Sequence, residues 1–142
     1  ETGEISGEPH NHQLMTDLRA HKVANIPVPD LEVEGAADDA ELLIVGFGGT
    51  YGHLHSALDS LLSKGEKVAL AHLKYINPLP KNTAEVLRRY KRVVVAELNG
   101  GQLASYLRMK VEGIHFEQYN QVMGQPFSVS KLVEAFNEII RK

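Results

Sequence analysis

The sequence predicts a parallel α/β sheet with helices on both faces. From residue 42 onward, short apolar runs alternate four times with segments whose apolar residues recur at helical spacing. The first run, within residues 41–52 (ELLIVGFGGTYG), leads directly into a glycine-rich turn. A short apolar run bounded by glycines is typical of a strand that is buried on both faces. These two patterns together indicate the fold class.

The composition indicates one globular domain and excludes several kinds of site. The chain has 142 residues, 23% of them charged, and a net charge of -3, which gives no reason to expect a nucleic acid or an anionic membrane as partner. It contains no cysteine, so it cannot itself supply a disulfide or thiolate ligands to an iron–sulfur cluster. No apolar run approaches the ~18 residues of a membrane span, and we expect a cytoplasmic protein. The first residue is not Met, which suggests a piece of a longer polypeptide.

The first 30 residues have little regular pattern, and we expect them to form a connector with a short helix. The α/β domain is then expected over residues 31–142. Prolines 27 and 29 favour extended backbone before them. The expected elements are a polar linker over 2–11, a helix over 12–23, an extended segment over 26–29 and a short edge strand over 31–33, closed by Gly35.

The remaining elements follow from apolar spacing and from residues that begin or end helices. Gly65 is placed to end the first helix of the domain, Asn82 or Thr83 to cap the second, and Ser128 or Ser130 to cap the last. Strands are expected over 42–47, 67–73, 92–98 and 114–119, and helices over 51–63, 83–90 and 102–110. A last helix follows its serine cap, and its apolar face is formed by Leu132, Val133, Phe136, Ile139 and Ile140.

Polar residues and glycines gather where the expected strands end. Ligands of open parallel sheets bind beyond the carboxyl ends of the strands, so these residues form the candidate surface. No nucleophile–base pair, metal-ligand cluster or complete cofactor motif is present among them, and we expect no catalytic, cofactor-binding or metal-binding residue. The candidate residues are Gly48, Gly49, Thr50, Tyr51, Asn77, Glu97, Asn99, Gln102 and Gln125.

The glycine-rich turn from Gly46 to Gly52 does not match a dinucleotide fingerprint. Tyr51 stands where the third glycine is needed, and the second strand ends at His72-Leu73-Lys74 with no acidic residue for a ribose. Two hypotheses remain for the glycines. The turn could bind a small anion or a nucleotide phosphate, or the glycines could simply let strand and helix pack closely.

The histidines and the residues after the third strand also allow more than one interpretation. His53 and His55 are two apart on a helix, so they point about 200° apart and cannot share a metal. His72 could carry a proton or be a polar residue under a loop. Glu97 and Asn99 could fix a loop or partner group. Alternatively, Asn99 could adopt a left-handed conformation while Glu97 pairs with a nearby Lys or Arg.

Four motifs resemble those of a known family. They are GGTYG at 48–52, NPLP at 77–80, ELNGGQL at 97–103 and NQVMGQPF at 120–127. In this order they resemble the C-terminal region of the alpha subunit of 2-oxoacid:ferredoxin oxidoreductases, most closely the 2-oxoglutarate type. The similarity runs from residue 42 to the end, and residues 2–22 are more loosely similar to the family's connector.

This resemblance implies a transketolase C-terminal-like domain: three α/β/α layers around a five-stranded mixed sheet, with 31–33 as the lone antiparallel strand. The whole enzyme would oxidatively decarboxylate a 2-oxoacid onto coenzyme A with thiamine diphosphate and Mg²⁺, and pass electrons through iron–sulfur clusters to ferredoxin. The family keeps these cofactors on other domains and subunits. This chain would then be inactive alone and would support an interface with an upstream pyrimidine-type domain and the thiamine-diphosphate-binding beta subunit. A self-associating domain is a further hypothesis.

Overall fold

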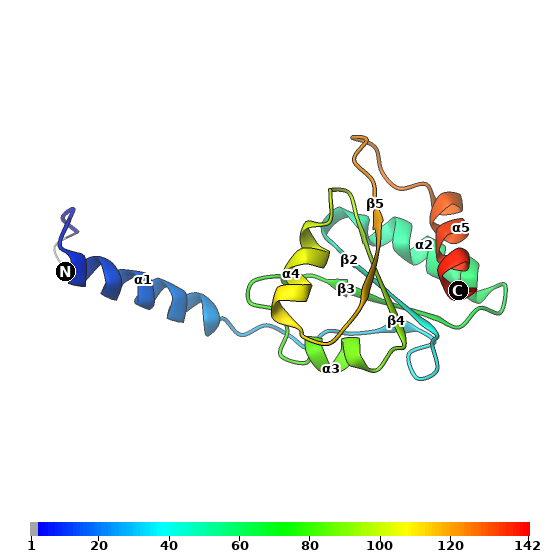
Figure 1. The fold of residues 1–142 in the computed structure, drawn as a ribbon, viewed down its shortest axis with the longest axis horizontal. Coiled ribbons are helices and arrows are strands. Elements are labelled where there is room, and N and C mark those ends of the chain that lie inside the picture. The colour runs from blue at the N-terminus through cyan, green and yellow to red at the C-terminus, as the bar shows by residue number, and fades with distance from the viewer. Residues whose placement is uncertain (1–2) are drawn as a thin grey trace.

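The computed structural model of the chain describes residues 3–142, so residues 1 and 2 of the expected connector lie outside the described residues. Helix α1 (Pro9–Ala24) projects away from an α/β body that contains the other elements (Figure 1). Within the part of the chain that the structure describes, no helix is both long enough and apolar enough to cross a membrane.

The body is built on one five-stranded sheet in the order β1-β3-β2-β4-β5. β1 pairs antiparallel with β3, and the remaining pairs are parallel, which confirms the mostly parallel five-stranded sheet. The strands are β1 (Glu34–Gly35), β2 (Leu42–Phe47), β3 (Val68–Leu73), β4 (Arg92–Glu97) and β5 (Phe116–Asn120); the helices are α2 (Tyr51–Leu62), α3 (Thr83–Arg88), α4 (Gln102–Lys110) and α5 (Val129–Ile140), and a 3-10 turn spans Gly48–Thr50.

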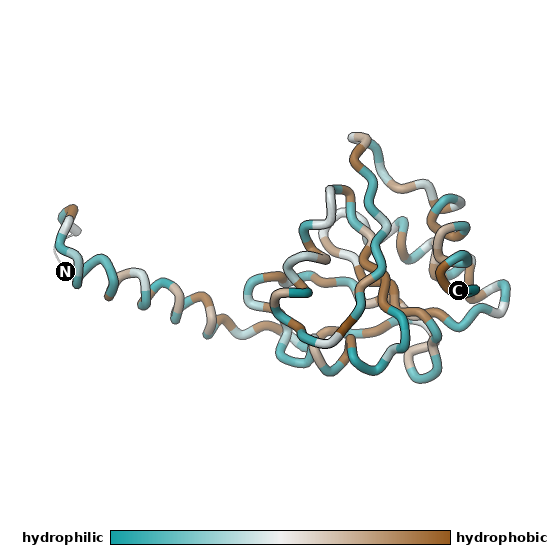
Figure 2. Tube along the Cα trace, viewed as in Figure 1, coloured by the Kyte–Doolittle hydropathy of each residue, from teal (hydrophilic) through white to brown (hydrophobic). Residues whose placement is uncertain are grey.

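The side chains of each central strand alternate between two apolar layers. In β2, Leu43 and Val45 pack with α3 and α4, whereas Leu42 and Ile44 pack with α2 and α5 on the opposite face. The central strands are correspondingly apolar along their length (Figure 2). Burying each such leucine stabilises the fold by about 1.5–3 kcal/mol. Helices therefore cover both faces of the sheet, and the three-layer α/β/α architecture is confirmed.

The N-terminal helix begins earlier than the sequence analysis expects. α1 starts at Pro9, so the linker expected over 2–11 is wrong for its last three residues, and His10 lies on the helix. Proline suits the first helical position because its missing N–H has no partner there anyway. Glu8 caps the helix, since its carboxylate accepts hydrogen bonds from the backbone of His10 and Asn11 at 2.9 and 2.6 Å.

The edge strand lies farther along the chain than the expected 31–33. β1 comprises Glu34 and Gly35 alone, although its antiparallel direction is as the resemblance implied. Leu31 cannot extend the ladder because the Asn82 side chain bonds both of its backbone groups, at 2.8 and 3.0 Å. Gly35, expected to close the strand, is part of it. A Cβ on Gly35 would lie 2.8 Å from the carbonyl oxygen of Val68, so this position requires glycine.

Candidate functional site

The glycines of the turn from Gly46 to Gly52 have different structural roles. A Cβ on Gly46 would collide with the Leu54 side chain, so that glycine serves the packing of α2 on the strand. Gly48 has a φ of 60°, which a left-handed turn requires. Gly49 faces open space. Thr50 is buried, and its hydroxyl donates to the carbonyl oxygen of Phe47 at 2.8 Å.

A crevice lies at the carboxyl ends of β2 and β4. These strands are neighbours, and the helices that follow them, α2 and α4, lie on opposite faces of the sheet. Such a reversal opens a space between the two strand ends, where ligands of open α/β sheets bind. The switch-point crevice has a volume of about 290 Å³ and is lined by Gly49, His53, Leu98, Gln121, Gly124, Gln125 and Pro126. None of these residues is an acid, a lysine or an arginine.

Glu97, the last residue of β4, and Asn99, which follows the strand, both hydrogen-bond backbone N–H groups at the start of α4. The Glu97 carboxylate is fully buried and accepts hydrogen bonds from the N–H groups of Leu103 and Ala104 at 2.7 and 3.0 Å. The Asn99 side-chain oxygen accepts from the N–H groups of Gly101 and Gln102, both at 2.9 Å. The first N–H groups of α4 are thereby satisfied internally, and this helix start is not open to an external anion.

The alternative interpretation of these two residues as an ion pair and a left-handed asparagine is wrong. Glu97 forms no ion pair within residues 3–142, because its partner is the start of α4. No non-glycine residue in that range has a positive φ; Gly101, with a φ of 101°, takes the left-handed conformation instead of Asn99. The side chain of Gln102 is exposed.

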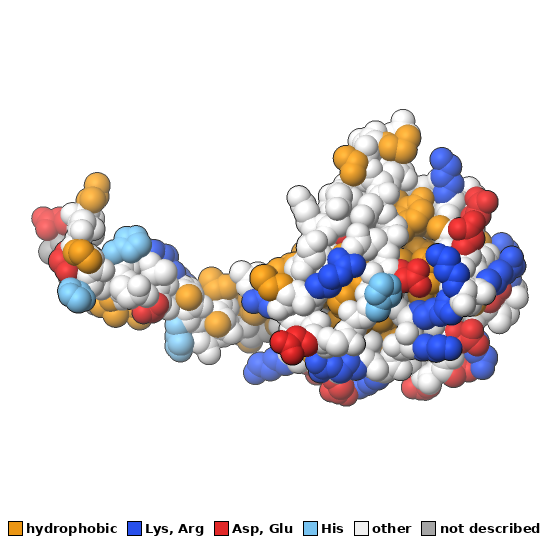
Figure 3. Space-filling model, in the orientation of Figure 1, with side chains coloured by type: hydrophobic (Ala, Val, Ile, Leu, Met, Phe, Trp, Pro, Cys, Tyr) orange, Lys and Arg blue, Asp and Glu red, His pale blue; other side chains and the backbone are white. Residues whose placement is uncertain are grey.

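Large apolar side chains are exposed beside the switch-point crevice. Leu98 follows β4 and is 40% exposed, while Val122 and Met123, in the loop after β5, are 75% and 67% exposed. Figure 3 shows hydrophobic side chains at the tip of the loop that follows β5. We call Leu98, Val122 and Met123 the carboxyl-edge patch. Its two loops flank the crevice, so apolar and uncharged groups occupy this part of the edge together.

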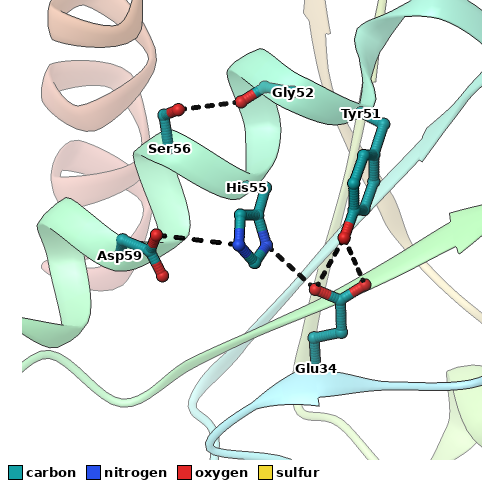
Figure 4. Close-up of polar contacts among 6 residues, drawn as sticks. All are labelled: Glu34, Tyr51, Gly52, His55, Ser56 and Asp59. Atoms are coloured by element: carbon teal, nitrogen blue, oxygen red, sulfur yellow. Dashed lines mark hydrogen bonds and ion pairs between the residues drawn. The ribbon is translucent and has the colours of Figure 1, made fainter.

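A polar cluster joins β1 to α2, on the side of β2 that faces away from the switch-point crevice (Figure 4). The Tyr51 hydroxyl donates to the Glu34 carboxylate, with 3.2 Å to each oxygen, and His55 Nδ1 lies 2.9 Å from the same carboxylate. Asp59 lies 3.7 Å from the other nitrogen of His55. The Tyr51 ring stacks on His55 and meets His72 edge-on. Burial and the bond to Glu34 raise the pKa of Tyr51.

This cluster forms one wall of a larger cavity beyond the end of β3. The cavity has a volume of about 610 Å³, and Glu34, Tyr51 and His72 line it together with Lys74 and Tyr75. Burial lowers the pKa of His72, so its imidazole is neutral near pH 7. Tyr51 therefore lies away from the switch-point crevice, although only Thr50 separates it from Gly49 in the sequence.

The nine candidate residues consequently do not form one site. Gly49 and Gln125 share the switch-point crevice, Tyr51 lines the cavity beside His72, and Asn77 lines a third groove next to α1. Glu97 and Asn99 serve the start of α4. Whether any of the nine binds a ligand stays a prediction. Within residues 3–142, no cluster of three acidic or histidine side chains is arranged to hold a metal ion.

Sequence reasoning missed Leu98, Gln121 and Glu34 as members of these sites. The adjacent apolar residues Val122 and Met123 in an otherwise polar loop were an available signal for the exposed patch. Glu34 gave no comparable signal, because its partners come from the helix α2, which is remote from it in the sequence.

Sequence comparison relates most of the chain to one family. Residues 40–132 match pyruvate:ferredoxin oxidoreductase core domain II. The chain is 54% identical over 109 residues to 2-oxoglutarate oxidoreductase subunit KorA of Mycobacterium tuberculosis, which covers 77% of this chain and 17% of that protein. It is 34% identical to the alpha subunit of 2-oxoacid:ferredoxin oxidoreductase 1 of Aeropyrum pernix, over 99% of this chain and 23% of that subunit. The chain thus spans about a fifth of the length of these relatives.

Structural comparison gives the same relationship. The 2-oxoglutarate:ferredoxin oxidoreductase of Magnetococcus marinus, solved with 2-oxoglutarate, coenzyme A and succinyl-CoA bound, superposes with a TM-score of 0.83 at 30% identity over 99% of this chain and 25% of that one. A split-gene transketolase superposes with a TM-score of 0.56 at 18% identity over 82% of this chain and 44% of its own, which shows a shared fold. The resemblance stated from the motifs is confirmed. The chain belongs to the pyruvate:ferredoxin oxidoreductase core domain II family, whose matched relatives include alpha-type subunits of 2-oxoacid oxidoreductases.

Proposed function

We propose that this chain is the C-terminal structural and subunit-interface domain of the alpha subunit of a 2-oxoacid:ferredoxin oxidoreductase of the 2-oxoglutarate type. The observation that carries the proposal is the carboxyl-edge patch beside a crevice that no acidic residue, lysine or arginine lines. Exposed apolar groups around such a concave surface suit contact with another polypeptide better than binding of a charged substrate. The start of α4, which is occupied by Glu97 and Asn99, gives no site for such a substrate either.

The matched relatives support this role through what their names state. Each is a 2-oxoglutarate or 2-oxoacid oxidoreductase, or a subunit of one. In the proposal, the domain contacts an upstream pyrimidine-type domain of the same subunit and a beta subunit that binds thiamine diphosphate and Mg²⁺. The cytoplasmic complex oxidatively decarboxylates a 2-oxoacid to its acyl-CoA and passes electrons through iron–sulfur clusters to ferredoxin. This domain contributes surface and no catalytic residue.

The interface role is tested in the complete alpha subunit, produced together with its beta subunit. Leu98→Glu combined with Met123→Glu places two charges on the carboxyl-edge patch and is expected to abolish co-purification and 2-oxoglutarate-dependent ferredoxin reduction. Met109→Glu is the matched control, because Met109 is 69% exposed near the far end of α4. Thermal unfolding of the 142-residue chain with the same changes checks that the domain still folds. Full assembly and activity of the double variant would overturn the proposal.

The absence of reaction machinery is tested on the 142-residue chain alone. Calorimetry with thiamine diphosphate and Mg²⁺ should give no binding heat, and 2-oxoglutarate with coenzyme A should give no turnover. Tight binding of the diphosphate, or turnover without a companion subunit, would show that the domain carries chemistry of its own.

The same preparation tests the two other hypotheses drawn from the sequence. Phosphate, nucleotides or coenzyme A should not raise the unfolding temperature; a rise of several degrees would favour anion binding at the turn from Gly46 to Gly52. No contact among residues 3–142 favours that hypothesis, and Gly46 has a packing role. Light scattering that gave a dimer mass would favour self-association.

A further inference from the structure

A groove separates the last turns of α1 from the body of the domain. We call it the α1 groove; its volume is about 530 Å³, within the range of sites for small organic ligands. Three elements distant in the sequence build it. The lining residues are Arg19, Ala20, Val23 and Ala24 of α1, Asn77, Pro78 and Leu79 of the loop after β3, and Tyr106 and Lys110 of α4.

The charged residues of the α1 groove are Arg19 and Lys110, and both are cations. Arg19 donates to the Thr16 hydroxyl at 3.3 Å, and the Lys110 ammonium lies 5.6 Å from the centre of the Tyr106 ring. Neither has an ion-pair partner within residues 3–142. The chain as a whole has 18 acidic and 15 basic residues and is therefore negatively charged. The groove lining has two basic residues and no acidic one, so its charge has the opposite sign.

The rest of the α1 groove is apolar or aromatic. Alanine and valine side chains of α1 face proline and leucine of the loop, and Tyr106 contributes an aromatic ring. The end of α1 would ordinarily repel an anion through its free carbonyl groups. Here Asn25 bonds the carbonyl oxygen of His21 with both its backbone N–H and its side chain, at 3.1 and 2.7 Å. Capping weakens this repulsion.

We infer that the α1 groove binds a small organic anion, in which a carboxylate or phosphate group is attached to an apolar body. The Arg19 guanidinium can donate two parallel hydrogen bonds to such a head group, and Lys110 adds a second positive charge. The ring of Tyr106 and the side chains of Val23 and Leu79 exclude water from the apolar body. This assignment is independent of the interface role of the carboxyl-edge patch, because the two sites share no residue.

The inference is tested by NMR titration of the 142-residue chain with three probes of one body: 4-phenylbutyrate, 4-phenylbutyl phosphate and the uncharged 4-phenylbutanol. Both anions should give saturable shifts confined to α1, residues 77–79 and α4, with millimolar affinity, and the alcohol should bind about tenfold more weakly. The ratio between the two anions identifies the preferred head group. Absence of saturable shifts for both anions, or equal binding of the alcohol, would overturn the inference.

Variants separate the groove from general attraction of anions to a cationic surface. Arg19→Gln and Lys110→Gln should each weaken binding of the preferred anion about threefold to fivefold, as expected for one partly exposed charge contact. Lys22→Gln removes the same charge from α1 at a residue that does not line the groove, and it should leave the affinity unchanged. These side chains are exposed, so the variants should fold. Equal weakening by Lys22→Gln would show that the site is not the groove.

Discussion

Glu97 holds the connection between β4 and α4 together from inside the protein. Its carboxylate is fully buried and satisfies two N–H groups in the first turn of α4. A buried carboxylate is unfavourable without hydrogen bonds, and so are buried N–H groups. Each therefore compensates the other, and the following Asn99 completes the cap in a more exposed position.

Removing the Glu97 side chain should destabilise the domain more than removing an exposed glutamate side chain. Glu97→Ala leaves two N–H groups without partners and should lower the free energy of unfolding by about 3 kcal/mol, whereas Asn99→Ala should lower it by about 1 kcal/mol. Guanidinium chloride unfolding of the 142-residue chain measures both values. The exposed Glu138→Ala is the control and should have almost no effect. A loss for Glu97→Ala no larger than that of Glu138→Ala would refute this account.

His72 should make the stability of the domain depend on pH in the weakly acidic range. Burial lowers its pKa below the ordinary 6.5, so the unfolded chain takes up a proton at a higher pH than the native one. The contribution of neutral His72 is therefore complete above about pH 6.5 and is lost as the pH falls through the lowered value.

The measurement compares the free energy of unfolding at pH 7.5 and pH 5 in three proteins. The decrease on acidification should be smaller in His72→Gln than in the unchanged chain. His115→Gln, at an exposed histidine, should keep the full decrease. If His72→Gln shows the same decrease as the unchanged chain, burial of this imidazole is not what links stability to pH.

At the scale of elements, the sequence predicts what local patterns determine. The expected bounds of β2 and α4 coincide with those observed. The apolar run of β2 ends at the glycine pair Gly48-Gly49, which favours a turn, and in α4 a glycine pair precedes a segment of good helix formers. Both signals act within a few residues, so no information about the rest of the fold is needed.

The elements that were misplaced depend on distant partners. β1 exists only because Glu34 and Gly35 pair with Leu70 and Ala69 of β3, and Leu31 is held by Asn82. Neither pairing has a local pattern, so the expected strand over 31–33 began three residues early. The start of α1 differs from the expectation for another reason: Pro9 fits a polar linker, but proline also favours the first turn of a helix.

The candidate site shows the same division. Sheet topology places the carboxyl ends of the four parallel strands on one edge, so the sequence correctly brings the residues at the ends of β2 and β4 to that edge. Which of them share a crevice depends on side-chain direction in a turn. Gly49 faces the space between β2 and β4, whereas Tyr51 turns toward β1 and bonds Glu34. The spacing of residues along the chain does not predict that Gly49 and Tyr51 face different sites.

At the scale of the whole molecule, the connector and the body differ in how they are stabilised. α1 has no buried residue, so its contacts with the body contribute little free energy. The body, in contrast, has two buried apolar layers. Leu31, which is 7% exposed, packs in the layer beneath α3 and α4. We therefore propose that the body folds without the connector and that the boundary lies at residues 30 and 31.

Two shortened chains test this boundary. A chain of residues 29–142 keeps Leu31 and its bonds to Asn82 and should unfold within a few degrees of the 142-residue chain. A chain of residues 36–142 lacks β1 and a buried leucine worth about 2 kcal/mol, so its unfolding temperature should fall by about 5–10 °C. Circular dichroism during heating measures both. A segment that buries no surface cannot stabilise the body by that much. If the 29–142 chain loses as much stability as the 36–142 chain, the connector therefore belongs to the folded unit.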